Sequence, residues 1–154
     1  MLRGIDLTTF IILALGEEPE NIIVNGTGTY KYHSSIADCG VTGRKLACDF
    51  YSTVAPIGGG CPWGKDTSKA DVTLNLYARK LALEYLQDND ECFVYLSSCI
   101  GQAELPSAVV KTVKYGMSNV QKLQITKKSS EIITELGLNK PLFAELCRKS
   151  LFSC

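Results

Sequence analysis

The chain has 154 residues, 45% of them hydrophobic, and its 16 Lys and Arg residues are balanced by 16 Asp and Glu residues. This length suits one domain with a buried core, and the composition excludes both a disordered tail and a fibrous repeat. A formal charge of zero excludes a general binder of nucleic acid or of anionic membranes, because sequence-independent binding to phosphates requires a basic face. We therefore expect a globular protein with no nucleic-acid partner and no membrane partner.

The cysteines, 7 in number, are scattered along the chain, and no two of them form a CxxC pair. Several have apolar neighbours, as in Ala47-Cys48 and Cys92-Phe93-Val94. An odd number of cysteines without paired spacing is typical of free thiols in a reducing compartment. The sequence therefore predicts mostly buried, unpaired cysteines in a cytoplasmic protein.

The N-terminal segment contains an apolar run from Phe10 to Leu15. This run is much shorter than a membrane span, and acidic residues follow it directly without a small-residue cleavage site. We therefore interpret residues 5–15 as a short helix that Gly16 and Pro19 end, and not as a targeting signal.

Residues 21–33 have the pattern of a β-hairpin. Two short segments, 21–24 and 29–33, are predicted strands, and residues 25–28 between them form a strong turn sequence because glycine accepts positive φ angles. Two polar loops that contain glycine, 38–45 and 56–69, then flank a predicted strand, 46–51.

A helix is predicted after the second loop. Apolar residues spaced three or four apart form one stripe along it, and these are Leu74, Tyr77, Ala78, Leu81 and Tyr85. Ser68 and Asp71 have the spacing of a capping box, which places Lys69 and Asp71 in the first turn.

The rest of the chain alternates between strands and helices. A strand at 92–97, a loop at 100–106 and a strand at 107–115 are predicted. The C-terminal third is predicted to be helical, with one segment ending near Gly137 and another starting at Pro141, since proline is tolerated in a first turn. This order favours an α/β or α+β two-layer sandwich.

Four basic residues, Arg44, Lys45, Lys65 and Lys69, lie in the glycine-containing loops or at the helix start. Glycine lets backbone N–H groups approach an anion closely, and a helix N-terminus favours negative charge. The pattern therefore predicts a site for a polyphosphate. The alternative interpretation is that these are ordinary solvated surface charges.

Three other features are candidate functional signals. Residues 59–65 have P-loop spacing, but Asp66 stands where that motif requires Ser or Thr, and no apolar strand leads into its first glycine. Asp71 either caps the helix dipole or holds a divalent cation that bridges phosphate oxygens. We interpret His33, the only histidine, as a surface or packing residue, which leaves a hydrolase triad without a base.

A series of motifs is more specific than any of these signals. In chain order they are Thr27-Gly28, Asp38-Cys39-Gly40-Val41-Thr42-Gly43-Arg44-Lys45, Gly58-Gly59-Gly60, Gly64-Lys65-Asp66, Ser68-Lys69 with Asp71, and Ile100-Gly101 with Ala103-Glu104. Together they resemble the C-terminal half of S-adenosylmethionine synthetase (methionine adenosyltransferase), and the resemblance fades after about Pro141. It implies an α+β sandwich of a mixed sheet with helices on one face, in which residues 1–33 end the middle domain and residues 34–154 form the C-terminal domain.

The resemblance also implies a reaction. In that family the sulfur of methionine attacks C5′ of ATP, and the triphosphate leaves and is hydrolysed. By resemblance, Arg44, Lys45 and Lys65 are the catalytic cations that bind the ATP phosphates. The remaining implied contacts are Tyr30, Asp38, Cys61 and Ile100 for ATP, Asp38 and Lys69 for methionine, and Asp71 for Mg²⁺.

The chain also departs from the family pattern. Thr29 and Pro56-Ile57 stand where the family has basic residues, and the family's Gly-His-Phe-Gly signature is absent. The family's N-terminal part is also absent. That part carries the His-Pro-Asp segment, a further Mg²⁺ ligand and the K⁺ ligand. Because the family assembles its site across a dimer, we expect a homo-oligomer or a hetero-oligomer with an N-terminal synthetase part, and no activity of the isolated chain. The alternative is a noncatalytic fragment that binds nucleotide or polyphosphate, or that modulates a full-length synthetase.

Overall fold

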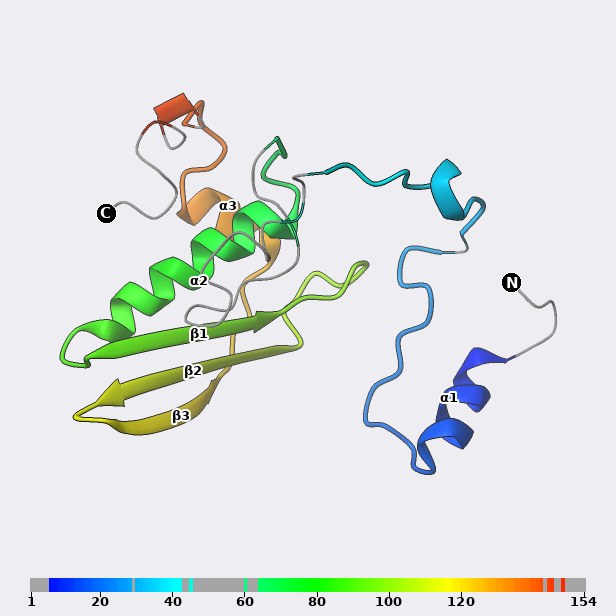
Figure 1. Cartoon of the computed structure of the whole chain (residues 1–154), viewed down its shortest axis with the longest axis horizontal. Coiled ribbons are helices and arrows are strands. Elements are labelled where there is room, and N and C mark those ends of the chain that lie inside the picture. The colour runs from blue at the N-terminus through cyan, green and yellow to red at the C-terminus, as the bar shows by residue number, and fades with distance from the viewer. Residues whose placement is uncertain are drawn as a thin grey trace. The chain divides into compact units, whose positions relative to one another are not determined.

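A computed structural model describes residues 6–28, 30–42, 45, 60, 64–142, 144–145 and 148. The chain divides into two compact units, Met1–Asp38 and Cys39–Cys154. Figure 1 shows a helix, α1, in the first unit and a sheet with helices in the second. No helix in the described part of the chain is long and apolar enough to cross a bilayer.

The first unit begins with α1, Leu7–Leu15, as predicted. Asp6 caps its N-terminus by accepting hydrogen bonds from the Thr9 hydroxyl at 2.6 Å and from the Thr8 N–H at 3.0 Å. These two bonds, the Thr9 bond first, hold the pKa of Asp6 below its usual value. Gly16 ends the helix in the left-handed conformation, with φ of 74°, and its N–H donates to the Ile12 carbonyl.

The β-hairpin predicted for residues 21–33 is wrong. Its turn is present, because the Gly28 N–H donates to the Asn25 carbonyl at 2.7 Å, but the described residues on either side form no strand. Tyr30 and Tyr32 are 71% and 68% exposed. An isolated pair of strands with no buried face has too little packing to hold its register. The chain continues instead into a 3₁₀ turn, η1, at Ser34–Ile36.

The second unit contains α2 (Ala70–Leu86), β1 (Glu91–Ser97), β2 (Ser107–Lys114), β3 (Met117–Leu123) and α3 (Ser129–Glu135). The strands form a sheet in the order β1-β2-β3, with antiparallel pairing throughout. This confirms the α+β class and the strands predicted at 92–97 and 107–115. The expected sheet was mixed, whereas the three described strands are all antiparallel. The strand predicted at 46–51 lies outside the described residues.

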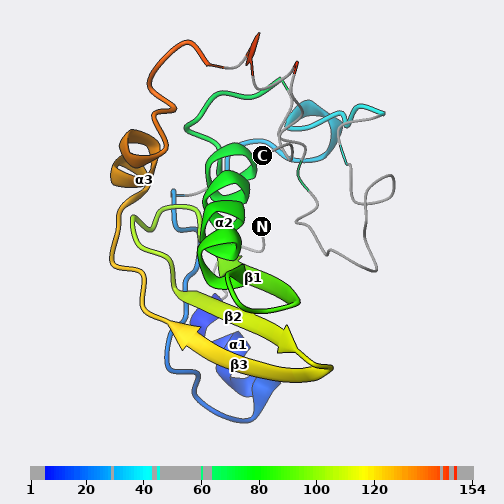
Figure 2. The ribbon, with the colours of Figure 1, turned by 90° about the vertical axis from the view of Figure 1, so that its left-hand side faces the viewer.

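The core lies between α2 and one face of the sheet (Figure 2). Antiparallel register pairs Val94 with Val110 and Leu96 with Ala108, so these residues share that face. The buried apolar residues are Val72, Tyr77, Ala108, Val110, Ile132 and Leu138. Of the apolar stripe predicted on α2, Tyr77 is buried and its other members are half-buried. The stripe is therefore only partly covered by the described residues.

The predicted all-helical C-terminal third is wrong at residues 117–123, which form β3. Tyr115 and Gly116 have φ angles of 51° and 76°, the backbone of a tight two-residue hairpin loop that joins β2 to β3. After β3 the prediction holds, because α3 is followed by Gly137 with φ of 66°. The helix predicted from Pro141 lies only partly within the described residues.

The described cysteines are less buried than predicted. Three of them, Cys39, Cys92 and Cys99, lie in the described part of the chain as free thiols. Cys39 is exposed and the other two are half-buried. Partial burial raises the pKa of the Cys92 thiol above its usual value, because the thiolate is less well solvated there.

An ionic cluster links α2 to α3. The Glu135 carboxylate accepts from Lys127 Nζ at 2.6 Å and from Lys80 Nζ of α2. These two lysines, Lys127 first, hold the pKa of Glu135 below its usual value.

We expect Glu135→Gln to lower the melting temperature by roughly one to three degrees near neutral pH, since partly exposed ion pairs contribute little. The folded-state pKa of Glu135 is lowered, so its contribution is present above the unfolded-state pKa and is lost as the pH falls through the folded value. Thermal melts of both proteins over a series of pH values from about pH 7 downward check this. A difference in melting temperature that does not shrink as the pH falls below the unfolded-state pKa would contradict it.

Candidate functional site

The loop before α2 is organised by Asp66. Its side chain accepts from the Ser68 N–H at 2.8 Å, and its carbonyl accepts from the Lys69 N–H at 3.2 Å. The Ser68 contacts hold the pKa of Asp66 below its usual value. Lys69 is the N-cap residue, and no side chain caps the helix there. The predicted Ser68–Asp71 capping box is therefore wrong, because Asp66 already uses the Ser68 N–H and the Asp71 carboxylate faces a different partner.

That partner is Lys65. The Lys65 ammonium donates to Oδ2 of Asp71, which lies in the first turn of α2 as predicted. The two side chains are 27% and 36% exposed, so the ion pair is partly shielded from water and open on one side. This arrangement places a cation and a carboxylate of the predicted phosphate and metal site in direct contact.

Gly60 lies against the same carboxylate. A Cβ atom at Gly60 would lie 1.5 Å from Oδ1 of Asp71, so this oxygen occupies the space that any side chain at position 60 would need. Glycine is therefore required here for close approach of the backbone to the carboxylate. Of the two carboxylate oxygens, Oδ2 faces the Lys65 ammonium.

Thr73 ties the loop to the helix. It is 2% exposed, and its hydroxyl donates to the Thr67 carbonyl at 2.5 Å. In addition, the side-chain amide of Asn75 donates to the Asp71 carbonyl at 2.6 Å. These bonds fix the direction in which the chain enters α2, and with it the positions of Lys65 and Lys69.

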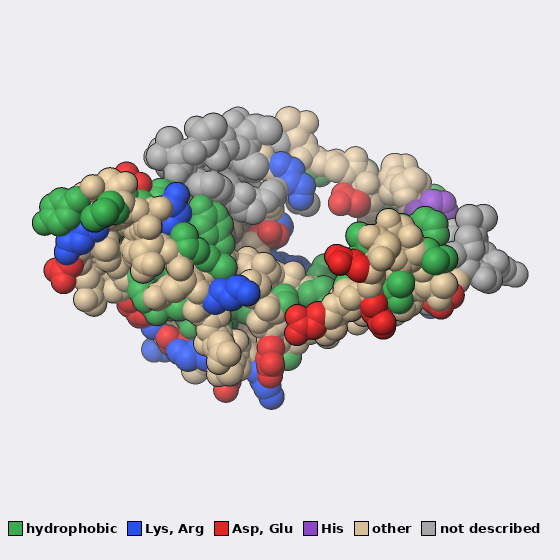
Figure 3. All heavy atoms as spheres, turned by 90° about the horizontal axis from the view of Figure 1, so that it is seen from below, with side chains coloured by type: hydrophobic (Ala, Val, Ile, Leu, Met, Phe, Trp, Pro, Cys, Tyr) green, Lys and Arg blue, Asp and Glu red, His purple; other side chains and the backbone are tan. Residues whose placement is uncertain are grey.

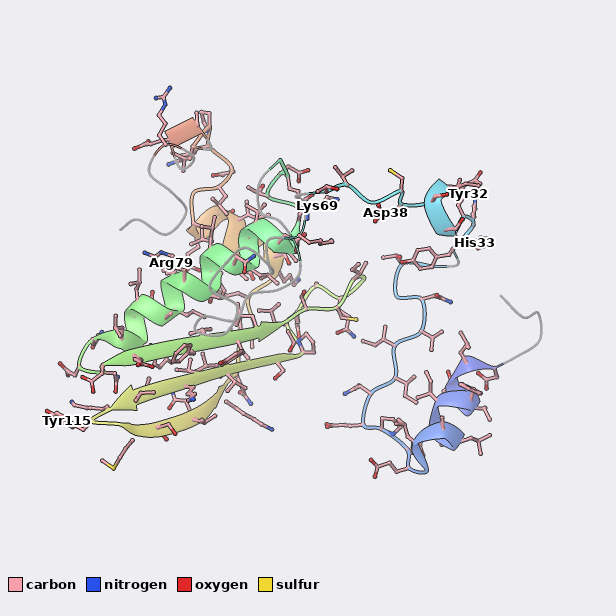
Figure 4. All side chains as sticks on the ribbon, viewed as in Figure 1. Tyr32, His33, Asp38, Lys69, Arg79 and Tyr115 are labelled. Atoms are coloured by element: carbon pink, nitrogen blue, oxygen red, sulfur yellow. The ribbon has the colours of Figure 1, made fainter. Side chains whose placement is uncertain are left out.

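The other predicted site residues are distributed over both units. Lys69 lies exposed at the start of α2, and Asp38 lies exposed in the first unit (Figure 4). Three more predicted site residues are exposed: Tyr30, Lys45 and Ile100. Tyr30 lies in the first unit. Ile100 lies in the loop after β1 and is 75% exposed. Arg44 and Cys61 lie outside the described residues. The roles of all these residues stay predictions.

His33, the only histidine, is exposed at the surface of the first unit (Figure 3). The surface interpretation made from the sequence is thus confirmed.

Asp71 fits one specific mode of magnesium binding. Within the described ranges, no group of three or more His, Cys, Asp or Glu side chains is placed to hold a metal. Mg²⁺ does not require such a cage, because it is commonly held by one or two carboxylates together with substrate phosphates and water. A single partly exposed carboxylate beside a lysine matches that mode, in which the nucleotide completes the coordination.

A groove of about 480 Å³ lies elsewhere, between α2 and the segment that follows α3. Most of its lining is leucine, with charged side chains beside them: Leu76, Arg79, Lys80, Leu83, Glu84, Leu136, Leu138 and Leu142. None of the predicted site residues lines it. The candidate site is therefore an open, polar surface at the start of α2, separate from this apolar groove.

Sequence reasoning missed two features of the site. The Thr73 hydroxyl bond reaches a loop carbonyl six residues earlier in the chain, outside the local patterns that relate a threonine to its neighbours in sequence. The direct Lys65–Asp71 contact was missed because the two residues are separated by a loop, where no helical or strand periodicity relates their side chains.

Comparisons with known proteins agree with the motifs. The family described as S-adenosylmethionine synthetase, C-terminal domain, matches residues 32–153. The S-adenosylmethionine synthases of Chlorobium phaeobacteroides and Paramagnetospirillum magneticum are 32% and 35% identical to the chain over 145 and 133 residues. These matches cover 88% and 81% of this chain but 36% and 34% of the relatives.

A third relative, the S-adenosylmethionine synthase of Pelagibacter ubique, is 33% identical over 135 residues, which cover 80% of this chain and 34% of the relative. No solved structure gives a significant match. The chain thus spans about a third of the length of the curated relatives that it matches. The family match covers most of the chain, including the loop and helix that carry Lys65 and Asp71, and the chain therefore belongs to the S-adenosylmethionine synthetase family, of which it contains the C-terminal domain.

Proposed function

We propose that this chain forms the part of an S-adenosylmethionine synthetase site that binds the ATP phosphates and Mg²⁺. The observation that carries the proposal is the pairing of Lys65 with Asp71 against Gly60 at the start of α2. The motifs that match the family include all three residues. A lysine for phosphate oxygens and a carboxylate for a hard cation are the two groups that a triphosphate site requires.

The chemistry of adenosyl transfer explains why such groups are needed. The leaving triphosphate carries several negative charges, and donors held in place before the reaction stabilise that charge without reorganising. In this proposal Lys65 and Lys45 donate to phosphate oxygens, together with Arg44. Asp71 holds Mg²⁺, which supplies charge neutralisation at the phosphates when bound, and Asp38 and Lys69 contact methionine. Tyr30, Cys61 and Ile100 contact the nucleotide, and no described residue is assigned to K⁺.

We propose in addition that the N-terminal part of the site comes from a partner, either a second chain of this family or a separate N-terminal synthetase part. The family resemblance supports this. We also propose that the protein is cytoplasmic. The free thiols of the described cysteines support this location.

The experiment is calorimetric titration of the full chain with a nonhydrolysable ATP analogue, with and without Mg²⁺. Saturable binding that requires Mg²⁺ is expected. Absence of binding would contradict the proposal for the isolated chain. If binding is present but mixing with an N-terminal synthetase part restores no turnover, the alternative of a noncatalytic nucleotide-binding modulator is favoured.

The sheet offers a surface for the proposed partner. Strand alternation places a second set of side chains on the face opposite to Ala108 and Val110. Tyr95 and Val120 on this face are 45% and 61% exposed. The apolar members of this outer sheet face are Phe93, Tyr95, Val109, Val113 and Val120. An exposed apolar surface of this kind favours association, and the family resemblance implies a sheet face between subunits.

We expect the chain to self-associate at micromolar concentration in sedimentation velocity, and Tyr95→Glu to weaken that association by about tenfold or more, because a charge would be buried in the interface. Tyr115→Glu is the matched control, since Tyr115 lies exposed in the β2–β3 turn (Figure 4). A wild-type chain that sediments as a monomer, or an equal effect of both substitutions, would contradict the expectation.

A further inference from the structure

We propose that Lys65 holds the metal ligand of this site in a closed state, occupying at Asp71 the position that a divalent cation would take. The Lys65 ammonium donates to Oδ2 of Asp71 in the chain by itself. The same oxygen would have to be released before a cation could bind there. The inference rests on the proposed function in assigning the metal to Asp71.

Gly60 limits the space around the same carboxylate. Oδ1 of Asp71 fills the space that a side chain at position 60 would occupy, so the backbone of residue 60 lies against that oxygen. A Cβ atom at position 60 would also lie 2.7 Å from Oδ2, so both oxygens face Gly60, and Oδ2 in addition faces the Lys65 ammonium. A metal ion and Lys65 therefore compete for this one carboxylate.

Electrostatic repulsion from Lys65 also disfavours binding of a divalent cation at Asp71. An ammonium a few ångströms from a divalent cation repels it, and this repulsion adds to the loss of the ion pair that the cation must displace. A triphosphate changes the balance, because its oxygens offer Lys65 an alternative partner and at the same time coordinate the metal. The ion pair thus disfavours binding of the metal alone and is exchanged when nucleotide phosphates arrive with it.

The consequence is a pair of effects with opposite sign. Removal of the Lys65 charge strengthens the binding of a divalent cation alone and weakens the binding of a triphosphate. If Lys65 and Asp71 were two independent ligands of the substrate complex, removal of the lysine would leave the binding of the cation alone unchanged.

The test measures Mn²⁺ alone, without nucleotide, by the electron paramagnetic resonance signal of the free ion in titrations of the full chain. Lys65→Gln is expected to bind Mn²⁺ about tenfold more tightly than the wild type, as the charge repulsion at this distance requires. Lys140→Gln is the matched control, because it removes the same charge at an exposed position after α3 and is expected to bind Mn²⁺ as the wild type does. The double variant Lys65→Gln with Asp71→Asn is expected to lack this increase in Mn²⁺ affinity.

Unchanged or weaker Mn²⁺ binding by Lys65→Gln would overturn the inference, and so would a gain that persists without the Asp71 carboxylate. Circular-dichroism melts establish that each variant is folded, and Lys65→Met serves as a second variant if the glutamine variant is not. Because no nucleotide is present, failure of the proposed triphosphate binding leaves this result interpretable. Conversely, triphosphate binding can be confirmed while the competition at Asp71 is refuted.

Discussion

Lys65→Ala is expected to weaken the binding of a nonhydrolysable ATP analogue in the presence of Mg²⁺ by roughly 10- to 100-fold. The lysine lies in a half-buried position beside the helix start, where it can donate a charge-assisted hydrogen bond to a phosphate oxygen. Such a bond contributes about 1.5 to 3 kcal/mol, which corresponds to that range of affinity. Isothermal titration calorimetry of the full chain measures the dissociation constant directly.

Two controls make this result specific. Lys140→Ala removes the same charge from an exposed position after α3, so it reports the effect of net charge alone and is expected to leave the affinity unchanged. Lys65→Arg keeps the charge and is expected to retain part of the affinity, because the guanidinium can still donate to phosphate. If Lys65→Ala binds the analogue as the wild type does, the assignment of this lysine to the phosphates is wrong.

Gly60→Ala is the second substitution with a large expected effect. The added methyl group would lie 1.5 Å from Oδ1 and 2.1 Å from Cγ of Asp71, so the carboxylate must move away. It can do so, because the Asp71 side chain is 36% exposed and sits at the end of a short, rotatable stem. The substitution is therefore expected to alter the geometry of the site more than the stability of the fold. We expect about a tenfold or greater loss of Mg²⁺-dependent analogue binding, together with a small change in melting temperature.

A double-mutant cycle shows whether Gly60→Ala acts through Asp71. If it does, Gly60→Ala adds little to the effect of Asp71→Asn, because both changes remove the same contact. Gly137→Ala is the matched glycine control: its φ of 66° makes the substitution unfavourable for the backbone, while the nearest atom to the added methyl is in Leu142. We expect it to lower the melting temperature without affecting analogue binding. Additive effects of Gly60→Ala and Asp71→Asn would mean that Gly60 acts by another route.

The competition between Lys65 and a metal joins these predictions. Lys65→Ala and Gly60→Ala both break the ion pair, but they differ in what remains. The first leaves the Asp71 carboxylate in place and available, whereas the second displaces it. We therefore expect binding of a divalent cation alone to increase in the first variant and not in the second, although both bind the triphosphate more weakly.

Local sequence patterns were sufficient for several elements. The helix at Leu7–Leu15 with its glycine end, the helix at Ala70–Leu86 and the strands at Glu91–Ser97 and Ser107–Lys114 were all predicted close to their observed bounds. Each is marked by periodicity of apolar residues or by a terminating glycine, which act over a few residues. The motifs around residues 38–71 were also sufficient to indicate the family, because the order and spacing of glycines and charges are properties of the sequence itself.

Other elements depended on contacts that local patterns do not contain. Residues 117–123 have few apolar side chains, and they form a strand because β2 supplies a hydrogen-bonded edge next to them. Residues 21–33 have a better strand pattern and form none, since no buried face supports them among the described residues. Strand formation requires a partner, and the presence of a partner is a tertiary property.

The candidate site divides in the same way. The sequence by itself determined which residue types are present at the start of α2: a lysine, an aspartate and a glycine in motifs that match a known family. Only the tertiary structure decided that Lys65 contacts Asp71 and that Gly60 lies against the same carboxylate. The reason is physical: these contacts join residues across a loop, and their geometry follows from where the Asp66 turn and the Thr73 hydroxyl direct the chain, not from any repeat along it.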